Sequence, residues 1–196
     1  MRLLLIRHGQ TATNVARLLD TAYPGSELDE TGHQQAEALV SLLDGLPLDA
    51  IYVSDLVRSQ QTAAPLALER GLEPIVRKGI REIQAGDYEM SEVWEHYVNV
   101  IVGWSTDPDG RIPGGESGRE VMARFNAVVR EAHEAGYETV AMVSHGAMIR
   151  TWAARVGALT PEFLTSAQLH NTLVVEVHGD PEAGWRVVRW GDVDVP

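Results

Sequence analysis

The chain has 196 residues, a formal net charge of −12 and no cysteine. This length fits one domain built around a single hydrophobic core. Without cysteine there can be no disulfide, no thiolate metal ligand and no cysteine nucleophile. The acidic charge opposes binding to nucleic acid or to an anionic membrane surface, because both need a basic face on the protein. An anion-handling site would have to gather its few cations in one pocket.

The first apolar run, Leu3 to Ile6, is cut by Arg7 and His8. It is too short for the core of a signal peptide, and no later stretch approaches the length of a membrane span. We therefore expect a cytoplasmic protein that does not bind membranes. A short apolar run bounded by charge is also typical of a strand buried on both faces of a parallel sheet, so the first strand is predicted here.

The first half of the chain alternates helix and strand patterns. Apolar residues at helical spacing predict a helix over 31–43, and a short strand follows at 50–53. A second helix is expected from about 56 to 70, ended by Gly71. Pro65 removes one backbone donor, which predicts a kink near Gln61 and Thr62 or a helix in two pieces. Residues 74–77 are predicted to form a third strand, at an edge that tolerates proline.

The second half begins with a segment at about 85–115 that has no clear period and is expected to hold loops and short helices. Ser117 and Glu120 have capping-box spacing and predict the start of a helix that Gly136 closes. The remaining patterns predict a strand, a helix closed by a glycine, and two further strands, at 139–143, 149–157, 172–177 and 185–190. These elements predict one α/β domain over 1–196 with a largely parallel sheet. The strand at 185–190 could be an exposed edge used in a homodimer.

Two segments share one local design, an apolar strand followed by a polar residue and then His-Gly. They are Ile6-Arg7-His8-Gly9 and Val143-Ser144-His145-Gly146. Ligands of open α/β sheets bind beyond the carboxyl ends of the strands, so both imidazoles should reach the same edge. Glycine lets the chain turn sharply and approach a bound oxyanion, and the helix beginning near Gly146 should aim free N–H groups at that anion.

Two charged side chains are expected at the same edge. Arg58 follows the strand at 50–53 by a few residues, although a solvated helix arginine is the alternative interpretation. Glu82 follows the predicted edge strand and could overhang the pocket, or it could be an ordinary surface charge.

Six ordered motifs, spread over nearly the whole chain, strongly resemble the histidine phosphatase (phosphoglycerate mutase-like) superfamily. They are R-H-G-Q-T-x-x-N at 7–14, L-D-E-T-G at 28–32, S-D-L-x-R-S-x-Q-T-A at 54–63, R-E at 81–82, G-G-E-S at 114–117 and S-H-G at 144–146. The resemblance implies a three-layer α/β/α sandwich with a mostly parallel central sheet, and a substrate-covering segment at about 85–115.

The resemblance also implies a role for each matching residue. His8 would be the nucleophile that becomes phosphohistidine, and Glu82 would donate a proton to the leaving oxygen. Arg7, Arg58 and His145 would complete the catalytic set. The phosphoryl group would be bound by six residues: Arg7, His8, Asn14, Arg58, His145 and Gly146. His8 must be neutral to attack, and two flanking arginines should lower its pKa.

A metal site is the competing interpretation, since His8, His145 and His170 could in principle bind zinc with nearby acids. Two neighbouring arginines would repel a divalent cation, and the chain has no His-x-x-x-His or Glu-x-x-His pair. We therefore expect neither a metal nor a cofactor. Four other histidines are expected on the surface: His33, His96, His133 and His178.

The superfamily contains phosphatases, which pass the phosphoryl group to water, and mutases, which return it to a second hydroxyl. The segment between Glu82 and His145 is short here, which favours hydrolysis. We expect a metal-independent phosphomonoesterase acting on a small-molecule phosphate ester, such as a sugar phosphate or a phosphoglycerate-like ester. The alternatives are phosphoglycerate mutase-type transfer and a catalytically idle phosphate-binding module, which would have no need of the proton donor Glu82.

One motif departs from the family pattern. Where relatives usually read W-E-G, this chain has Asp87-Tyr88-Glu89-Met90, so Met90 replaces a glycine and the loop's shape is open. The substrate-specificity wall is expected to include Tyr23, His96 and Tyr97.

Overall fold

A computed structural model of the protein describes residues 1–195, which are built around a seven-stranded sheet in the order β3-β2-β4-β1-β5-β6-β7. Neighbouring strands among β3, β2, β4 and β1 pair in parallel, and β5, β6 and β7 add to them antiparallel. The sheet is therefore parallel at its core, as predicted. The strands are β1 (Arg2–Arg7), β2 (Ala50–Val53), β3 (Ile75–Val76), β4 (Thr139–Ser144), β5 (Val174–Asp180), β6 (Gly184–Trp190) and β7 (Val193–Asp194).

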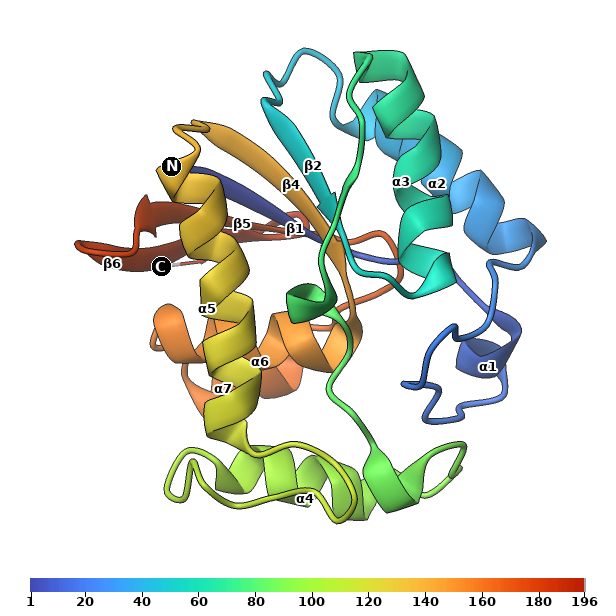
Figure 1. Cartoon of the computed structure of the whole chain (residues 1–196), viewed down its shortest axis with the longest axis vertical. Coiled ribbons are helices and arrows are strands. Elements are labelled where there is room, and N and C mark those ends of the chain that lie inside the picture. The colour runs from blue at the N-terminus through green and yellow to red at the C-terminus, as the bar shows by residue number, and fades with distance from the viewer. Residues whose placement is uncertain (196) are drawn as a thin grey trace.

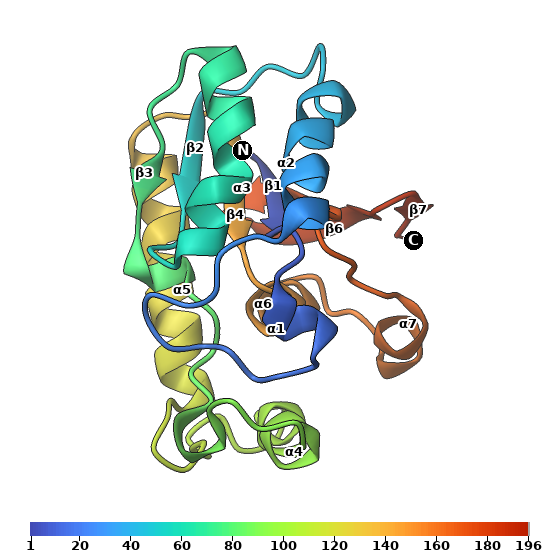
Figure 2. The same ribbon diagram turned by 90° about the vertical axis from the view of Figure 1, so that its right-hand side faces the viewer.

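Helices cover both faces of this sheet (Figures 1 and 2). One face carries α2 (Glu30–Leu42) and α3 (Val57–Arg70), and the other carries α5 (Gly118–Glu134) and α6 (Gly146–Val156). This is the predicted three-layer sandwich. The remaining helical elements are α1 (Ala12–Val15), η1 (Lys78–Ile80), η2 (Gly86–Tyr88), α4 (Glu95–Gly103) and α7 (Pro161–Ser166).

The core has two layers because side chains alternate between the faces of each strand. Leu4 and Ile6 of β1 pack on the α2 and α3 side. Leu3 and Leu5 pack on the other side, in the cluster that also holds Trp152 of α6. All five side chains are at most 1% exposed, so β1 is buried on both faces as its sequence predicts.

Helix ends follow the predicted signals closely. Ser117 and Glu120 form the reciprocal capping box that opens α5. Gly71 ends α3 in the left-handed conformation at φ 63°. The expectation of a helix in two pieces is wrong, since α3 runs unbroken through Pro65. Ala63 and Leu66, on either side of this proline, are fully buried against the sheet, and this packing outweighs the lost backbone hydrogen bond.

The C-terminal strands agree with the predicted sheet edge over most of β6. β6 pairs with β5 on one side, and on its other side the two-residue strand β7 pairs with its last residues, Arg189 and Trp190. The two-residue strand β7 and the helix α7 have too few residues to give a periodic signal. A homodimer stays a prediction. Within residues 1–195, no helix has the length and apolar character needed to cross a bilayer.

The segment predicted to cover the substrate contains η2 and α4, and α4 lies beyond the sheet at the end to which β2 and β4 point (Figure 1). Two buried aromatic side chains anchor it, Tyr97 at 2% and Trp104 at 3% exposure. A Cβ at Gly118 would come within 2.6 Å of the Trp104 ring, so glycine lets this indole pack against the start of α5.

Candidate active site

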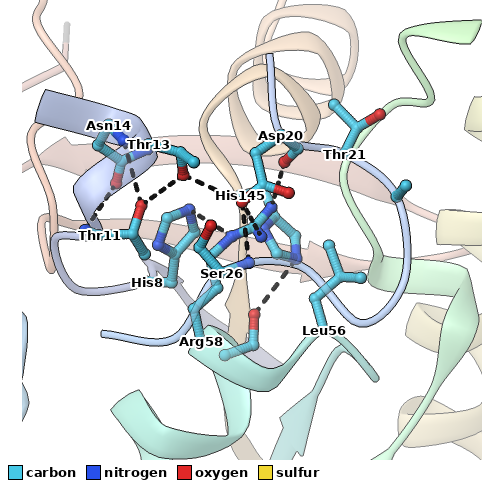
Figure 3. Close-up of polar contacts among 12 residues, drawn as sticks. His8, Thr11, Thr13, Asn14, Asp20, Thr21, Ser26, Leu56, Arg58 and His145 are labelled. Carbon is cyan, nitrogen blue, oxygen red and sulfur yellow. Dashed lines mark hydrogen bonds and ion pairs between the residues drawn. The ribbon is translucent and has the colours of Figure 1, made fainter. Parts of the chain in front are cut away.

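The two histidines meet at the carboxyl ends of neighbouring strands. β1 and β4 pair in parallel with Arg7 opposite Ser144, so the next residues, His8 and His145, lie side by side. Their ring centroids are 5.1 Å apart, and both side chains are at most 3% exposed (Figure 3). The predicted meeting of the two imidazoles at one sheet edge is therefore found.

His8 is held in one tautomer. Its Nδ1 lies 2.7 Å from the carbonyl oxygen of Gly9, which can only accept, so Nδ1 carries the proton. Nε2 then has a free lone pair, and it accepts a hydrogen bond from Nε of Arg58 at 3.1 Å. Burial, and after it the charges of Arg58 and Arg7, hold the pKa of His8 well below its ordinary value, against the opposing effect of the Gly9 carbonyl. His8 is a neutral imidazole with a nucleophilic nitrogen.

Arg58 reaches the site from the first turn of α3 and is 2% exposed. Its Nη2 donates to the main-chain oxygen of Asp20 at 2.7 Å, and its Nη1 lies 3.5 Å from the Asp20 carboxylate. That carboxylate also accepts hydrogen bonds from the Thr13 hydroxyl and the Ser26 N–H (Figure 3). Burial lowers the pKa of Arg58, and the charges of Asp20 and Glu82 oppose this effect. The loop after α1 therefore fixes the guanidinium over the histidines.

Two buried nitrogen atoms at this edge have no hydrogen-bond partner within the described part of the chain. They are Nε of Arg7 and Nδ1 of His145. Arg7 is anchored through Nη1, which donates to the Leu169 carbonyl at 2.6 Å. A Cβ at Gly146 would lie 3.4 Å from Arg7 Nε, so the guanidinium runs along the start of α6. Buried polar atoms are normally paired, so these two atoms point to a polar ligand.

Glu82 lies at the N-terminal end of α6. Its Oε1 accepts N–H bonds from Ile83 and Met148, both at 2.9 Å, and its Oε2 accepts one from Ala147 at 3.1 Å. The expectation that the start of this helix aims free N–H groups at a bound anion is therefore not met by Ala147 and Met148, whose N–H groups bind the Glu82 carboxylate. Within residues 1–195, Oε2 accepts one hydrogen bond, which leaves it a free lone pair.

Asn14 is positioned by the short helix α1, whose N-cap is Thr11. The Asn14 side-chain oxygen accepts from the Thr11 N–H at 3.3 Å and from the Asn171 amide at 3.1 Å. The same Asn171 amide donates to the His8 carbonyl at 2.9 Å. Asn14 is thus linked to the end of β1 beside the two histidines.

Sequence reasoning gave no role to four polar residues that contact the predicted site. Asn171 lies in an irregular turn and Asp20 in a loop, where spacing carries no signal. Ser54 and Ser59 do lie within the motif at 54–63, and both hydroxyls contact His145 Nε2. That motif was the available signal for them.

The three predicted specificity residues have different environments. Tyr23 is 66% exposed, and its ring lies 5.7 Å from the Arg81 guanidinium. His96 is exposed and stacks on Tyr88. Tyr97 is buried at 2% exposure and its hydroxyl donates to the Ile83 carbonyl, so its prediction as a wall residue is wrong. Tyr97 instead supports the backbone next to Glu82.

Met90 adopts a positive φ of 59°, a conformation that favours glycine. The preceding residue, Glu89, accepts N–H bonds from Thr21 at 2.7 Å and Ala22 at 3.0 Å, and a further bond from the Thr21 hydroxyl. Glu89 therefore holds the loop that carries Asp20.

The other histidines do not join the site. His33, His96, His170 and His178 are exposed, and His133 is half-buried. Among residues 1–195, no group of three or more His, Asp or Glu side chains is placed to share a metal ion.

Comparison with known proteins shows the family to which the chain belongs. The family model described as "Histidine phosphatase superfamily (branch 1)" matches residues 3–193. The chain belongs to this superfamily. The expected family resemblance is thereby confirmed.

Relatives in this superfamily include phosphatases and mutases. The chain is 32% identical to a 2,3-bisphosphoglycerate-dependent phosphoglycerate mutase of Brucella ovis, over 86% of this chain and 87% of the mutase. It is similar to the structure of a mycobacterial glucosyl-3-phosphoglycerate phosphatase complexed with VO3, with 28% identity, a TM-score of 0.81 and coverage of 98% and 99%. It is also 32% identical to the PE-PGRS family protein PE_PGRS11 of Mycobacterium tuberculosis, over 97% of this chain but only 36% of that protein's length.

Proposed function

We propose that this histidine phosphatase superfamily member hydrolyses small phosphate monoesters without a metal ion, through a phosphohistidine on His8. The observation that carries the proposal is the tautomer of His8, whose Nε2 lone pair lies within 3.1 Å of Arg58. A neutral nucleophilic nitrogen beside two guanidiniums is what attack on a phosphoryl group requires.

The ester would be bound by N–H groups of Arg7 and Arg58. Arg7 Nε has no partner within residues 1–195 and can donate to a phosphoryl oxygen. Arg58 Nε would transfer its hydrogen bond from His8 to another phosphoryl oxygen, which frees the His8 lone pair. Charge-assisted hydrogen bonds of this kind strengthen as negative charge spreads over the oxygens in the transition state. Asn14 of α1 and Gly146 at the start of α6 would complete the phosphate-binding site.

Two chemical steps follow. His8 Nε2 forms a bond to phosphorus as the ester P–O bond breaks, and the leaving alkoxide takes a proton from Glu82. Water then attacks phosphorus, gives its proton to the Glu82 carboxylate, and the P–N bond breaks to restore neutral His8 and release inorganic phosphate. Glu82 must therefore carry a proton in the first step and accept one in the second, which the free lone pair on Oε2 allows.

The test is release of p-nitrophenol from p-nitrophenyl phosphate, measured with and without EDTA. The proposal predicts turnover that EDTA does not change and that His8→Ala abolishes. Loss of turnover with EDTA would indicate a metal hydrolase, and absence of turnover in the wild type would indicate an idle phosphate-binding module.

The Brucella relative makes phosphoryl transfer the second candidate function. Incubation with 3-phosphoglycerate and a bisphosphoglycerate primer separates the two. Hydrolysis predicts inorganic phosphate as the product, whereas 2-phosphoglycerate formed faster than phosphate would identify a mutase.

A further inference from the structure

The hydroxyl groups of Ser54 and Ser59 contact the second histidine of the site. His145 is fully buried, and its Nε2 lies 2.7 Å from the Ser54 hydroxyl and 3.2 Å from the Ser59 hydroxyl. Both serines are also fully buried. Its other ring nitrogen, Nδ1, has no partner among the described residues.

The hydrogen bonds of Ser54 decide which nitrogen of His145 carries the proton. The Ser54 hydroxyl donates its one proton to Ser59 at 3.0 Å and accepts the Leu56 N–H at 3.2 Å. With that proton directed at Ser59, Ser54 can only accept at its 2.7 Å contact with Nε2. This is the shorter of the two serine contacts, so it favours a proton on Nε2 over acceptance of the Ser59 proton at 3.2 Å. A neutral imidazole has a single N–H, and Nδ1 is then left with a bare lone pair.

Burial, together with the charges around it, keeps His145 neutral before an anion binds. Burial, followed by Arg58, His8, Arg124 and Arg7, holds the pKa of His145 well below its ordinary value. These groups approach from β1, α3 and α5, and none of them is an acid that would favour an imidazolium. His8 and His145 therefore have opposite tautomers: His8 bears its proton on Nδ1, and His145 bears it on Nε2.

A lone pair at His145 Nδ1 would repel an anionic phosphoryl oxygen. We propose that Ser54 is a positioning residue that fixes the Nε2–H tautomer of His145, so that phosphate binding places one proton between Nδ1 and a phosphoryl oxygen. This inference depends on the proposed function, because it assumes that the phosphoryl group binds beside His8. A monoanionic ester brings this proton on its own oxygen. A dianionic ester binds with uptake of one proton from solvent, and His145 becomes an imidazolium that donates to both Ser54 and the ester.

The tautomer can be measured by NMR of protein labelled with 15N-histidine, in which the His145 signals are assigned from their loss in His145→Gln. In the free wild type we expect Nε2 protonated and Nδ1 unprotonated. Inorganic phosphate is then added to saturation above about pH 7, where a phosphate group with a second pKa of about 6 is mostly a dianion. Both nitrogens of His145 should then be protonated.

The serine variants test what sets this state. In Ser54→Ala/Ser59→Ala, Nε2 faces two methyl groups, so we expect the ring to shift mainly to the Nδ1–H tautomer, which needs no added proton to bind phosphate. The matched control is Ser144→Ala, which removes another fully buried hydroxyl at the same sheet edge, one that donates to the Ile80 carbonyl instead. Its His145 tautomer should match the wild type.

Two results would overturn the inference. The first is seen in the wild type: His145 is protonated on Nδ1 in the free protein, or on a single nitrogen when phosphate is bound. This measurement does not depend on the folding of any variant. The other is an unchanged tautomer in the folded double variant. If either result is found while turnover is normal and His8 becomes phosphorylated, the proposed function stands and only the role of Ser54 is refuted. If His145 has the expected Nε2–H tautomer but no phosphohistidine forms, only the proposed function is refuted.

Discussion

Replacing Asp20 by asparagine should destabilise the protein in the absence of phosphate. The Arg58 and Asp20 side chains are only 3% and 9% exposed, and they form an ion pair at 3.5 Å. Breaking a fully buried pair costs about 3–5 kcal/mol because it leaves a charge without a partner. Arg58 keeps its bonds to the Asp20 carbonyl and to His8. We therefore expect a smaller loss, about 1.5–3 kcal/mol, in the range of one hydrogen bond to a charged group.

This loss should depend on pH and on phosphate. Burial raises the pKa of Asp20, but hydrogen bonds from Ser26 and the charge of Arg58 outweigh it and hold the pKa below its ordinary value. A lowered pKa stabilises the folded state above the unfolded-state pKa of about 3.9, and the effect disappears as pH falls through the folded-state value. The difference in the free energy of unfolding between wild type and Asp20→Asn should be largest at neutral pH and should decrease below about pH 4. Phosphate should also narrow it, because the anion then pairs with Arg58.

The assay is urea unfolding followed by tryptophan fluorescence, at neutral and acidic pH and with or without phosphate. Asp109→Asn is the control, since it removes an Asp–Arg pair in which both side chains are 66% exposed, and it should leave stability unchanged. Equal stability of wild type and Asp20→Asn at neutral pH without phosphate would refute the reasoning, as would an equal gain from phosphate in both.

Three further predictions follow from the site and the core. The acid limb of kcat/KM should lie below the ordinary histidine pKa of about 6.5, because burial and two arginines keep His8 neutral there; a limb at or above this value would contradict it. Glu89→Ala should speed hydrogen exchange at Thr21 and lower kcat/KM, since the loop holding Arg58 loses its anchor; unchanged exchange would count against this role. Trp152→Ala should cost about 3–5 kcal/mol in urea unfolding because the indole is fully buried; a loss below about 1 kcal/mol would show that the cavity collapses.

The sequence predicted the parts of the fold that have a strong local signal. The run Leu3 to Ile6 is buried on both faces as its composition requires, and the Ser117 capping box opens α5 where its spacing indicates. Short elements such as α1 and β7 have no period to detect. The predicted division of α3 into two pieces at Pro65 is wrong, because the local pattern shows the cost of proline but not the packing of α3 on the sheet.

For the candidate site, the sequence predicted that His8 and His145 would meet, and they do, because parallel strands bring their carboxyl ends to one edge. The motifs could not show how each side chain is oriented. The binding of Glu82 to the first turn of α6 depends on a contact between residues far apart in the chain. The burial of Tyr97 likewise depends on how α4 packs, which an aperiodic segment does not reveal.

The most direct test of the account is a search for the covalent intermediate. The enzyme is mixed with a phosphate ester that it hydrolyses, quenched in alkali during turnover and digested. Mass spectrometry should then find one phosphoryl group on the peptide that contains His8, and acid should remove this group. Glu82→Gln should change the amount of this phosphoryl group without moving it, and His8→Ala should remove it. Steady turnover with no phosphorylated peptide, or with the phosphoryl group on another residue, would contradict the account.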